Sequence, residues 1–163
     1  MSAGDYDGAE IVPEQSRQRA TLENVARAEL AVVAIAVLLA LDLLFLPWFQ
    51  ITIIGGGQTV PISDPATGAP DGWLGVLALL AVVALLADLG IERLSPQTQV
   101  PAIGDSRART RMVLALTAAG LLAFKLLIHF GSAGGVGFWG ALLLAGGLVY
   151  CTHRVWRLEA ALR

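Results

Sequence analysis

Apolar residues gather in four long blocks, near residues 30–48, 73–91, 112–130 and 136–153. A helix of about 20 apolar residues, rising roughly 1.5 Å per residue, crosses the hydrocarbon core of a bilayer, which is about 30 Å thick. The four blocks therefore predict four transmembrane helices. Because the turn at residues 131–135 is short enough to force the third and fourth blocks into an antiparallel pair, we expect an all-α membrane protein, an antiparallel four-helix transmembrane bundle whose single domain covers residues 13–163.

The residues that precede the first block are polar. Residues 1–12 are small and acidic, which predicts a disordered cytoplasmic tail. Pro13 and Glu14 suit the first turn of a helix, so residues 15–29 are expected to form a polar helix that leads into the first span. The arginines of this helix either lie against anionic lipid headgroups or are solvated in the cytoplasm.

The connection between the first and second blocks has the pattern of a short β-hairpin. β-Branched residues stand on both sides of a glycine triplet at residues 55–57, and such a pattern favours two strands joined by a tight turn. An isolated hairpin is only marginally stable in water, so we expect it to rest on the bundle or on a partner. On either side, Pro47 ends the first helix, Trp48 is expected at the level of the lipid headgroups, and Asp71 is placed to cap the second helix.

Composition and the distribution of charge place the chain in a membrane and orient it. Of its 163 residues, 56% are hydrophobic and 15% are charged, and four spans leave no room for a separate soluble domain. Arginines lie before the first block, between the second and third blocks and in the C-terminal tail, whereas residues 49–72 and 131–135 contain neither lysine nor arginine. The positive-inside rule then predicts a multi-pass protein of the cytoplasmic (plasma) membrane, with both termini in the cytoplasm and an extracytoplasmic hairpin.

Two charges interrupt the apolar blocks near their outer ends. Asp42 lies six residues before Trp48, and Lys125 lies five residues before Phe130, so both are about 8–9 Å inside the outer interface at the rise of a helix. An unpaired charge at the centre of a span costs about 2.5–3.5 kcal/mol, and somewhat less nearer the interface. We therefore expect an intramembrane charge pair between Asp42 and Lys125, which His129, one turn above Lys125, could join.

Three interpretations of this charge pair are open. It is a salt bridge that fixes the register of the helices, or it is a proton or ion relay, because an Asp and a His beside a cation are the usual parts of one. In the third, Lys125 extends toward the headgroups while Asp42 meets another subunit or protein. A comparison of Asp42→Asn, Lys125→Met and the double variant separates the first interpretation from the second.

Two further sets of residues mark contacts between helices. Near the inner end of the second span, Asp88 lies about one turn from the cytoplasm, where Arg93, Arg111 or Arg154 could reach it. In the fourth span, small residues recur every four positions and predict a stripe that allows close helix contact. This stripe consists of Gly137, Ala141 and Ala145.

The sequence lacks the motifs of the common enzyme classes. It contains no phosphate-binding glycine loop, no Gly-x-Ser-x-Gly and no His-Glu-x-x-His. Its single cysteine, Cys151, excludes an intramolecular disulfide and a cysteine-based metal site. We therefore expect no enzyme, and no catalytic, cofactor-binding or metal-binding residues. The expected partners are the lipid bilayer and a membrane protein or a second copy of the chain, and not a nucleic acid.

The Leu-Pro-Trp-Phe sequence at residues 46–49, the strand-prone connection after it and the Gly-Trp pair at residues 72–73 resemble small four-span membrane proteins common in actinobacteria. The resemblance covers about residues 30–150 and implies a bacterial integral membrane protein, but it brings no activity, because the function of that group is unassigned. Small multidrug-resistance exporters also have four spans and an acid in the first. The position of Asp42 near the outer side and the strong charge bias depart from their pattern.

These observations favour a non-enzymatic integral membrane protein, a subunit, scaffold or assembly factor that acts through helix contacts and through its outer connection. The small size, the missing catalytic motifs and the absence of an obvious conduction path support this interpretation. The alternative is a small oligomeric channel or transporter that uses Asp42, Lys125 and His129 as an ion or proton site.

Overall fold

The computed structural model describes residues 14–55, 58–68, 71–94, 106–130 and 135–161. In chain order its elements are α1 (Glu14–Phe45), β1 (Phe49–Gly55), β2 (Gln58–Asp64), α2 (Gly72–Leu94), α3 (Arg107–Ile128) and α4 (Val136–Ala160). The tail predicted at residues 1–12 lies outside the described residues, and so do two glycines of the triplet and most of the connection at residues 131–135.

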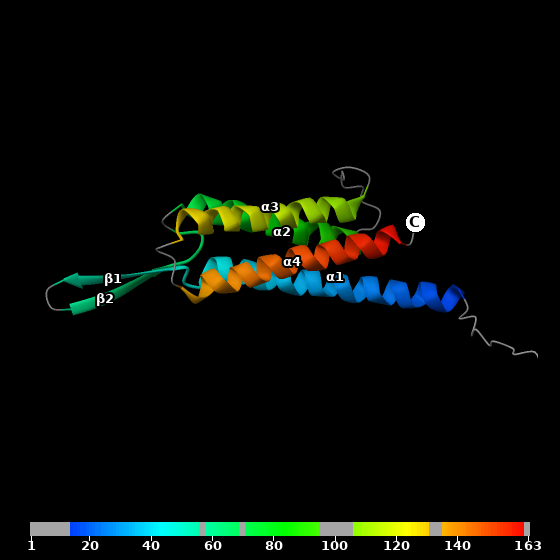
Figure 1. Cartoon of the computed structure of the whole chain (residues 1–163), viewed down its shortest axis with the longest axis horizontal. Coiled ribbons are helices and arrows are strands. Elements are labelled where there is room, and N and C mark those ends of the chain that lie inside the picture. Colours follow the sequence, from blue (N-terminus) through cyan, green and yellow to red (C-terminus); the bar gives the residue numbers. More distant parts are fainter. Residues whose placement is uncertain (1–13, 56–57, 69–70, 95–105, 131–134, 162–163) are drawn as a thin grey trace, which may run out of the picture.

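The four helices pack side by side as a bundle, with successive helices running in opposite directions (Figure 1). Each helix contacts the next one in the chain, and α4 closes the bundle against α1. The start of α1, the end of α2, the start of α3 and the end of α4 lie at one end of the molecule, and the strands project from the other. This is the arrangement expected of successive spans joined by short connections.

All four helices are long and apolar enough to cross a membrane. Only 28–44% of each apolar segment is buried inside the bundle. Large apolar side chains cover much of the remaining surface, among them Leu38, Leu80, Leu127 and Leu143. A soluble protein rarely exposes so large an apolar surface, so the fold is that of a multi-pass membrane protein surrounded by lipid.

α1 is the longest helix and exceeds the thickness of a bilayer. Its 32 residues measure about 48 Å at the helical rise, whereas the hydrocarbon core is about 30 Å thick. Its apolar part is Leu22–Phe45. The helix ends at Phe45, earlier than predicted, because Pro47 disfavours a helical conformation in the residue before it and cannot donate a backbone hydrogen bond.

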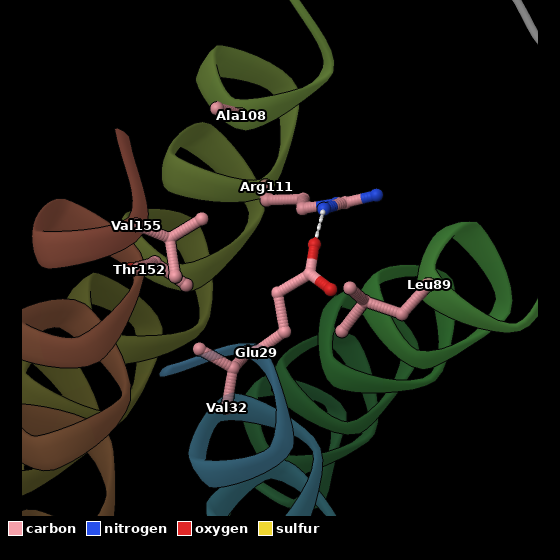
Figure 2. A pocket seen from close by; sticks show the side chains of 7 residues that line it. All are labelled: Glu29, Val32, Leu89, Ala108, Arg111, Thr152 and Val155. Atoms are coloured by element: carbon pink, nitrogen blue, oxygen red, sulfur yellow. Dashed lines mark hydrogen bonds and ion pairs between the residues drawn. The ribbon is translucent and has the colours of Figure 1, made fainter. Parts of the chain in front are cut away.

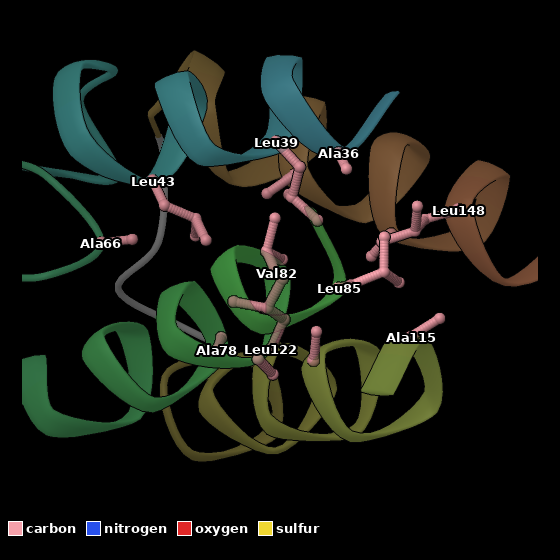
Figure 3. Close-up of a cluster of buried hydrophobic side chains, with 14 of the residues drawn as sticks. Ala36, Leu39, Leu43, Ala66, Ala78, Val82, Leu85, Ala115, Leu122 and Leu148 are labelled. Carbon is pink, nitrogen blue, oxygen red and sulfur yellow. The ribbon is translucent and has the colours of Figure 1, made fainter. Parts of the chain in front are cut away.

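Leucine, valine and alanine fill the centre of the bundle (Figure 3). Lipid tails are as apolar as these side chains, so close packing between helices carries more of the stability in a membrane than burial does. Alanines among the larger residues let the helices approach one another. Buried residues at the centre are Ala36, Leu39, Leu43, Ala78, Val82, Leu85, Ala115, Leu122 and Leu148.

β1 and β2 form an antiparallel two-stranded sheet that projects beyond the helix ends (Figure 1). Phe49 pairs with Asp64 at the base of the sheet, and Thr52 lies opposite Pro61. Next to the base, the backbone N–H of Trp48 donates to the carbonyl of Asp64 over 2.9 Å. The sheet is therefore joined to the bundle at its base, and its far part extends away from the helices.

The predicted small-residue stripe of α4 is buried, and its first residue lies against the segment that follows α1. Gly137, Ala141 and Ala145 are all buried. A Cβ atom at Gly137 would lie 2.8 Å from Leu46 Cβ and 2.9 Å from Trp48 Cδ1, which is closer than packed carbon atoms approach. Glycine at this position therefore lets the segment after α1 pack directly on α4.

Candidate functional site at the two ends of the bundle

At the end where the strands project, Asp42 of α1 is buried and bonded to an indole. Its Oδ2 accepts a hydrogen bond from Trp48 Nε1 over 3.2 Å, and the two residues are 3% and 2% exposed. The other oxygen, Oδ1, has no hydrogen-bond partner and is the one such buried side-chain atom in the described part of the chain. It packs against Gly140 of α4, where an added Cβ would lie 3.0 Å from it.

Lys125 of α3 is fully buried at the same end, where it holds the connection between β2 and α2. Its ammonium donates to the backbone carbonyl of Ala66 and, over 3.3 Å, to that of Asp71. The ring centroids of Trp48 and Phe49 lie 5.7 and 5.3 Å from Nζ, within the range of cation–π attraction. Carbonyl oxygens and aromatic rings therefore replace the water that would surround an exposed lysine.

His129 directly follows α3 and joins Lys125 to Asp71. Its Nδ1 donates to the carbonyl of Lys125 over 3.1 Å, and its Nε2 lies 3.6 Å from Asp71 Oδ2. Asp71 has a φ of 50°, a left-handed conformation that costs about 1–2 kcal/mol in a residue with a Cβ. The contacts with Lys125 and His129 offset that cost and fix the start of α2.

The structure corrects the predicted charge pair. Within the described residues, no salt bridge joins Asp42 to Lys125, because Asp42 is bonded to Trp48 and Lys125 to two carbonyls. Trp48 contacts both charged groups, one through its N–H and the other through its ring. Trp48, which is expected at the level of the lipid headgroups, does not face the lipid: it is buried in the bundle, edge-on to Phe138 with a centroid separation of 5.7 Å.

At the opposite end, Arg111 of α3 is buried and bound by three carboxylates. Its Nε donates to Asp88 Oδ2 over 2.7 Å, its Nη1 donates to Glu29 Oε1 over 3.2 Å, and its Nη2 donates to Glu92. Glu29 belongs to α1, and the other two acids belong to α2, so one guanidinium ties three helices together. Arginine suits this position because its planar group presents five donors in fixed directions.

Glu29 extends this network to a second arginine and borders a small cavity (Figure 2). Its Oε2 lies 3.5 Å from Arg93 Nη2. The cavity beside Glu29 and Arg111 has a volume of about 10 Å³, at the lower limit for a single water molecule. The network therefore joins helices and leaves no room for a larger ligand. The other walls of the cavity are Val32, Leu89, Ala108, Thr152 and Val155.

Of the three arginines expected within reach of Asp88, Arg111 is the one that binds it. Arg93 bonds to Glu29 instead. Arg154 is exposed on α4, where it lines a hollow on the side of α1. The three arginines therefore lie in different surroundings, and of them only Arg111 contacts Asp88.

Several groups of the two sites were missed from the sequence. Glu29 and Glu92 lie directly outside the apolar blocks, within about one helical turn of the depth of Asp88, and that similar depth is the signal that could have found them. Ala66 takes part only through its backbone carbonyl, which no side-chain pattern marks. Tryptophan at the end of a span is common at the lipid interface, so the sequence does not mark Trp48 as a buried group of the site.

Within the described ranges, no three or more His, Cys, Asp and Glu side chains are arranged to hold a metal ion. Glu29 and Asp88 are bound by arginines, and His129 is bound by a carbonyl and by Asp71. These polar contacts can therefore hold the helices and the connections between them in fixed positions relative to one another. Asp42 Oδ1 is buried without a hydrogen-bond partner in the described part of the chain, so this oxygen could hold a proton.

Comparison of the chain with protein-family models, with curated proteins and with solved structures finds no match. The comparisons therefore transfer no activity, substrate or partner to it. Its class follows from the fold alone, a four-helix bundle with the length and the apolar surface of a multi-pass membrane protein.

Proposed function

We propose that the chain is a non-enzymatic integral protein of the cytoplasmic membrane, a subunit, scaffold or assembly factor that binds a second protein through its projecting strands. Both termini face the cytoplasm in this proposal, because the arginines gather at their end of the bundle, and the strands face outward. One observation carries the proposal: buried polar groups fix the base of the sheet to the bundle, while the rest of the sheet projects from it (Figure 1).

The base of the sheet is held from two helices. Trp48, directly before β1, bonds to Asp42 of α1, and the connection after β2 is bonded by Lys125 of α3. A binding element that is already held in place loses less conformational freedom when a partner binds. Buried charges are costly in a membrane protein and by default indicate a functional site. Their presence at the base of the sheet therefore supports the proposal that the orientation of the sheet matters for function.

The open edges of the sheet indicate how a partner would bind. Each strand of a two-stranded sheet has one unpaired edge, and such an edge can pair with a strand of another protein. Pro61 has no N–H, so a regular ladder places its nitrogen on the open edge of β2, where it discourages pairing. Thr52, which lies opposite, then presents its N–H on the open edge of β1. We therefore place the partner at β1.

The test uses the tagged full chain, purified from its native membrane in a mild detergent, with a photo-crosslinking residue in place of Gln50 of β1. We expect a stoichiometric second protein in the intact mass of the assembly, joined to β1 by the crosslink. Thr52→Pro removes an outward N–H without removing a bond of the ladder and should abolish the capture. Thr52→Val keeps that N–H and should retain it. A chain that purifies alone, as a monomer or a homo-oligomer, would contradict the proposal.

One observation favours the alternative, a small oligomeric channel or transporter with an ion or proton site formed by Asp42, Lys125 and His129. Asp42 Oδ1 is buried without a partner, and carboxylates in that situation occur in proton relays. Liposomes that contain the purified chain and a pH-sensitive dye would then conduct protons. Asp42→Asn should fold normally and abolish that flux. A wild-type flux equal to that of empty liposomes rejects the alternative.

A further inference from the structure

A groove runs between α3 and α4 at the end of the bundle where α3 begins and α4 ends. These two helices are neighbours in the bundle (Figure 1). Its volume is about 660 Å³, within the range of pockets that hold small molecules. Its walls include Ser106, Arg109, Val113 and Leu116 on the side of α3, and His153 and Trp156 on the side of α4.

The polar and apolar residues of this groove lie at different depths. Ser106 and Arg109 stand at the start of α3, whereas Leu116 lies seven residues beyond Arg109, about 10 Å deeper along the helix. Val113, Leu116 and Trp156 are 38%, 49% and 42% exposed. The groove therefore has a cationic mouth at the level of lipid headgroups and an apolar floor at the level of lipid tails.

Arg109 is available to a ligand at the mouth of the groove. Two residues further along α3, Arg111 turns into the bundle and binds three carboxylates. Arg109 is exposed instead, and it forms no salt bridge with a carboxylate in the described part of the chain. The start of α3 adds the positive end of a helix dipole at the same place. Glu159 lines the neighbouring hollow with Ser106 and Trp156, but no described carboxylate forms a salt bridge with Arg109, so its guanidinium can bind an anion.

We propose that the groove binds one anionic phospholipid from the leaflet at this end of the bundle. The phosphate bonds to Arg109, the indole of Trp156 lies at the headgroup level, where tryptophan is favoured, and one acyl chain lies along Val113 and Leu116. A lipid suits the groove better than a peptide does, because an extended backbone in the hydrocarbon region would lack hydrogen-bond partners. The proposal requires that the helices span a membrane, but not that the strands bind a protein.

Native mass spectrometry of the full chain in a neutral detergent tests the site. The probe is palmitoyl-oleoyl phosphatidylglycerol, and phosphatidylcholine with the same chains is the zwitterionic reference. We expect one phosphatidylglycerol per chain, bound about fivefold more tightly than phosphatidylcholine, as one arginine near a lipid surface contributes. Arg109→Gln should remove this preference. Leu116→Trp fills the floor of the groove and should weaken the binding of both lipids by similar factors.

Arg157→Gln is the matched control, since Arg157 is an exposed arginine of α4 at the same end that does not line the groove. It should leave the preference unchanged. Equal losses in Arg109→Gln and Arg157→Gln would overturn the proposal, because the preference would then come from the general charge of this end. Absence of any preference in the wild-type chain would also overturn it. So would a dimer that Leu116→Trp dissociates, since a second copy would then fill the groove.

Discussion

At the scale of single residues, the buried cation of α3 is stabilised without a salt bridge to a carboxylate in the described part of the chain. Two backbone carbonyls and two aromatic rings surround the Lys125 ammonium. The same bonds satisfy the carbonyls of Ala66 and Asp71, which belong to a connection that would otherwise lie loosely on the helix ends. A buried carbonyl that loses its donor costs about 1–3 kcal/mol. Lys125 therefore stabilises the chain mainly through this connection.

The observed contacts predict that Asp42→Asn and Lys125→Met do not compensate for each other, because the two groups have different hydrogen-bond partners. Lys125→Met should lower the free energy of unfolding by about 2–4 kcal/mol, because two carbonyls lose their donor. Asp42→Asn should change it by less than about 1 kcal/mol, since the amide oxygen still accepts from Trp48 and no charge stays buried. Reversible unfolding of both variants and of the double variant in mixed micelles measures these values.

A direct ion pair predicts the opposite pattern, in which each single substitution destabilises the protein and the double variant recovers. Asp42 and Lys125 do not bond to each other, but both contact Trp48, so any coupling between the two substitutions should come through that ring and stay below about 1 kcal/mol. A larger recovery in the double variant would restore the pairing of Asp42 with Lys125 that the sequence suggested.

Buried charges could be recognised from the sequence, but their partners could not. Asp42, Lys125, Asp88 and Arg111 stand out because a charge inside an apolar block must be satisfied by some other group. Depth along a helix can be counted from the sequence, whereas the direction of a side chain depends on how the helix is rotated in the bundle. Trp48 was misplaced because an indole at the end of a span is common both at the lipid interface and in the interior.

At the scale of elements, the connections at the end where the strands project lie directly on the starts of α2 and α4. The segment around Ala66 packs on Gly75 of α2, where an added Cβ would collide with the Ala66 carbonyl. The segment after α1 packs on Gly137 of α4 in the same way. The missing side chains at Gly75 and Gly137 therefore let the two segments pack closely on α2 and α4. This close packing places Trp48 and Ala66 next to the buried charges.

Gly137→Ala should lower the free energy of unfolding by about 1–3 kcal/mol, because the new Cβ would overlap Leu46 and Trp48. Gly146→Ala in the same helix is the matched control, since nothing lies within 4 Å of an added Cβ there. It should be neutral or stabilise the protein by up to about 1 kcal/mol. Thermal unfolding followed by circular dichroism measures both. Similar effects of the two substitutions would rule out the close approach at Gly137.

The helices could be predicted as apolar blocks, but their ends could not. α2 continues to Leu94, beyond the block that ends at residue 91, because apolar content marks where a helix leaves the membrane rather than where it stops. The two strands lie where β-branched residues flank the glycine triplet. Their direction depends on contacts of Trp48 and Lys125 that are distant in the sequence, so no local pattern contains it.

At the scale of the whole molecule, the two ends of the bundle are built differently. At one end the Arg111 network joins α1, α2 and α3 to one another. At the other end, the polar groups around Lys125 bind connections rather than helices. The first end fixes how the helices pack, and the second fixes how the strands leave the bundle.

Arg111→Gln should lower the free energy of unfolding by about 3–5 kcal/mol, because Asp88 would stay buried without its charged partner. Arg111→Lys should recover only part of this loss, since an ammonium cannot reproduce the geometry of the guanidinium. Arg157→Gln, an exposed control, should stay within about 0.5 kcal/mol of the wild type. Detergent-induced unfolding provides the comparison. A loss below about 1 kcal/mol in Arg111→Gln would be inconsistent with a network that ties three helices.

The proposed function depends on a sheet that Lys125 and Trp48 hold in one direction relative to the bundle. Spin labels at Thr59 of β2 and Val136 of α4, in a Cys151→Ser background, report the distance between sheet and bundle by pulsed electron paramagnetic resonance. We predict one narrow distance distribution in the labelled chain and a broad one when Lys125→Met is added. A distribution that is broad from the start, or that stays narrow after Lys125→Met, would contradict this role of Lys125.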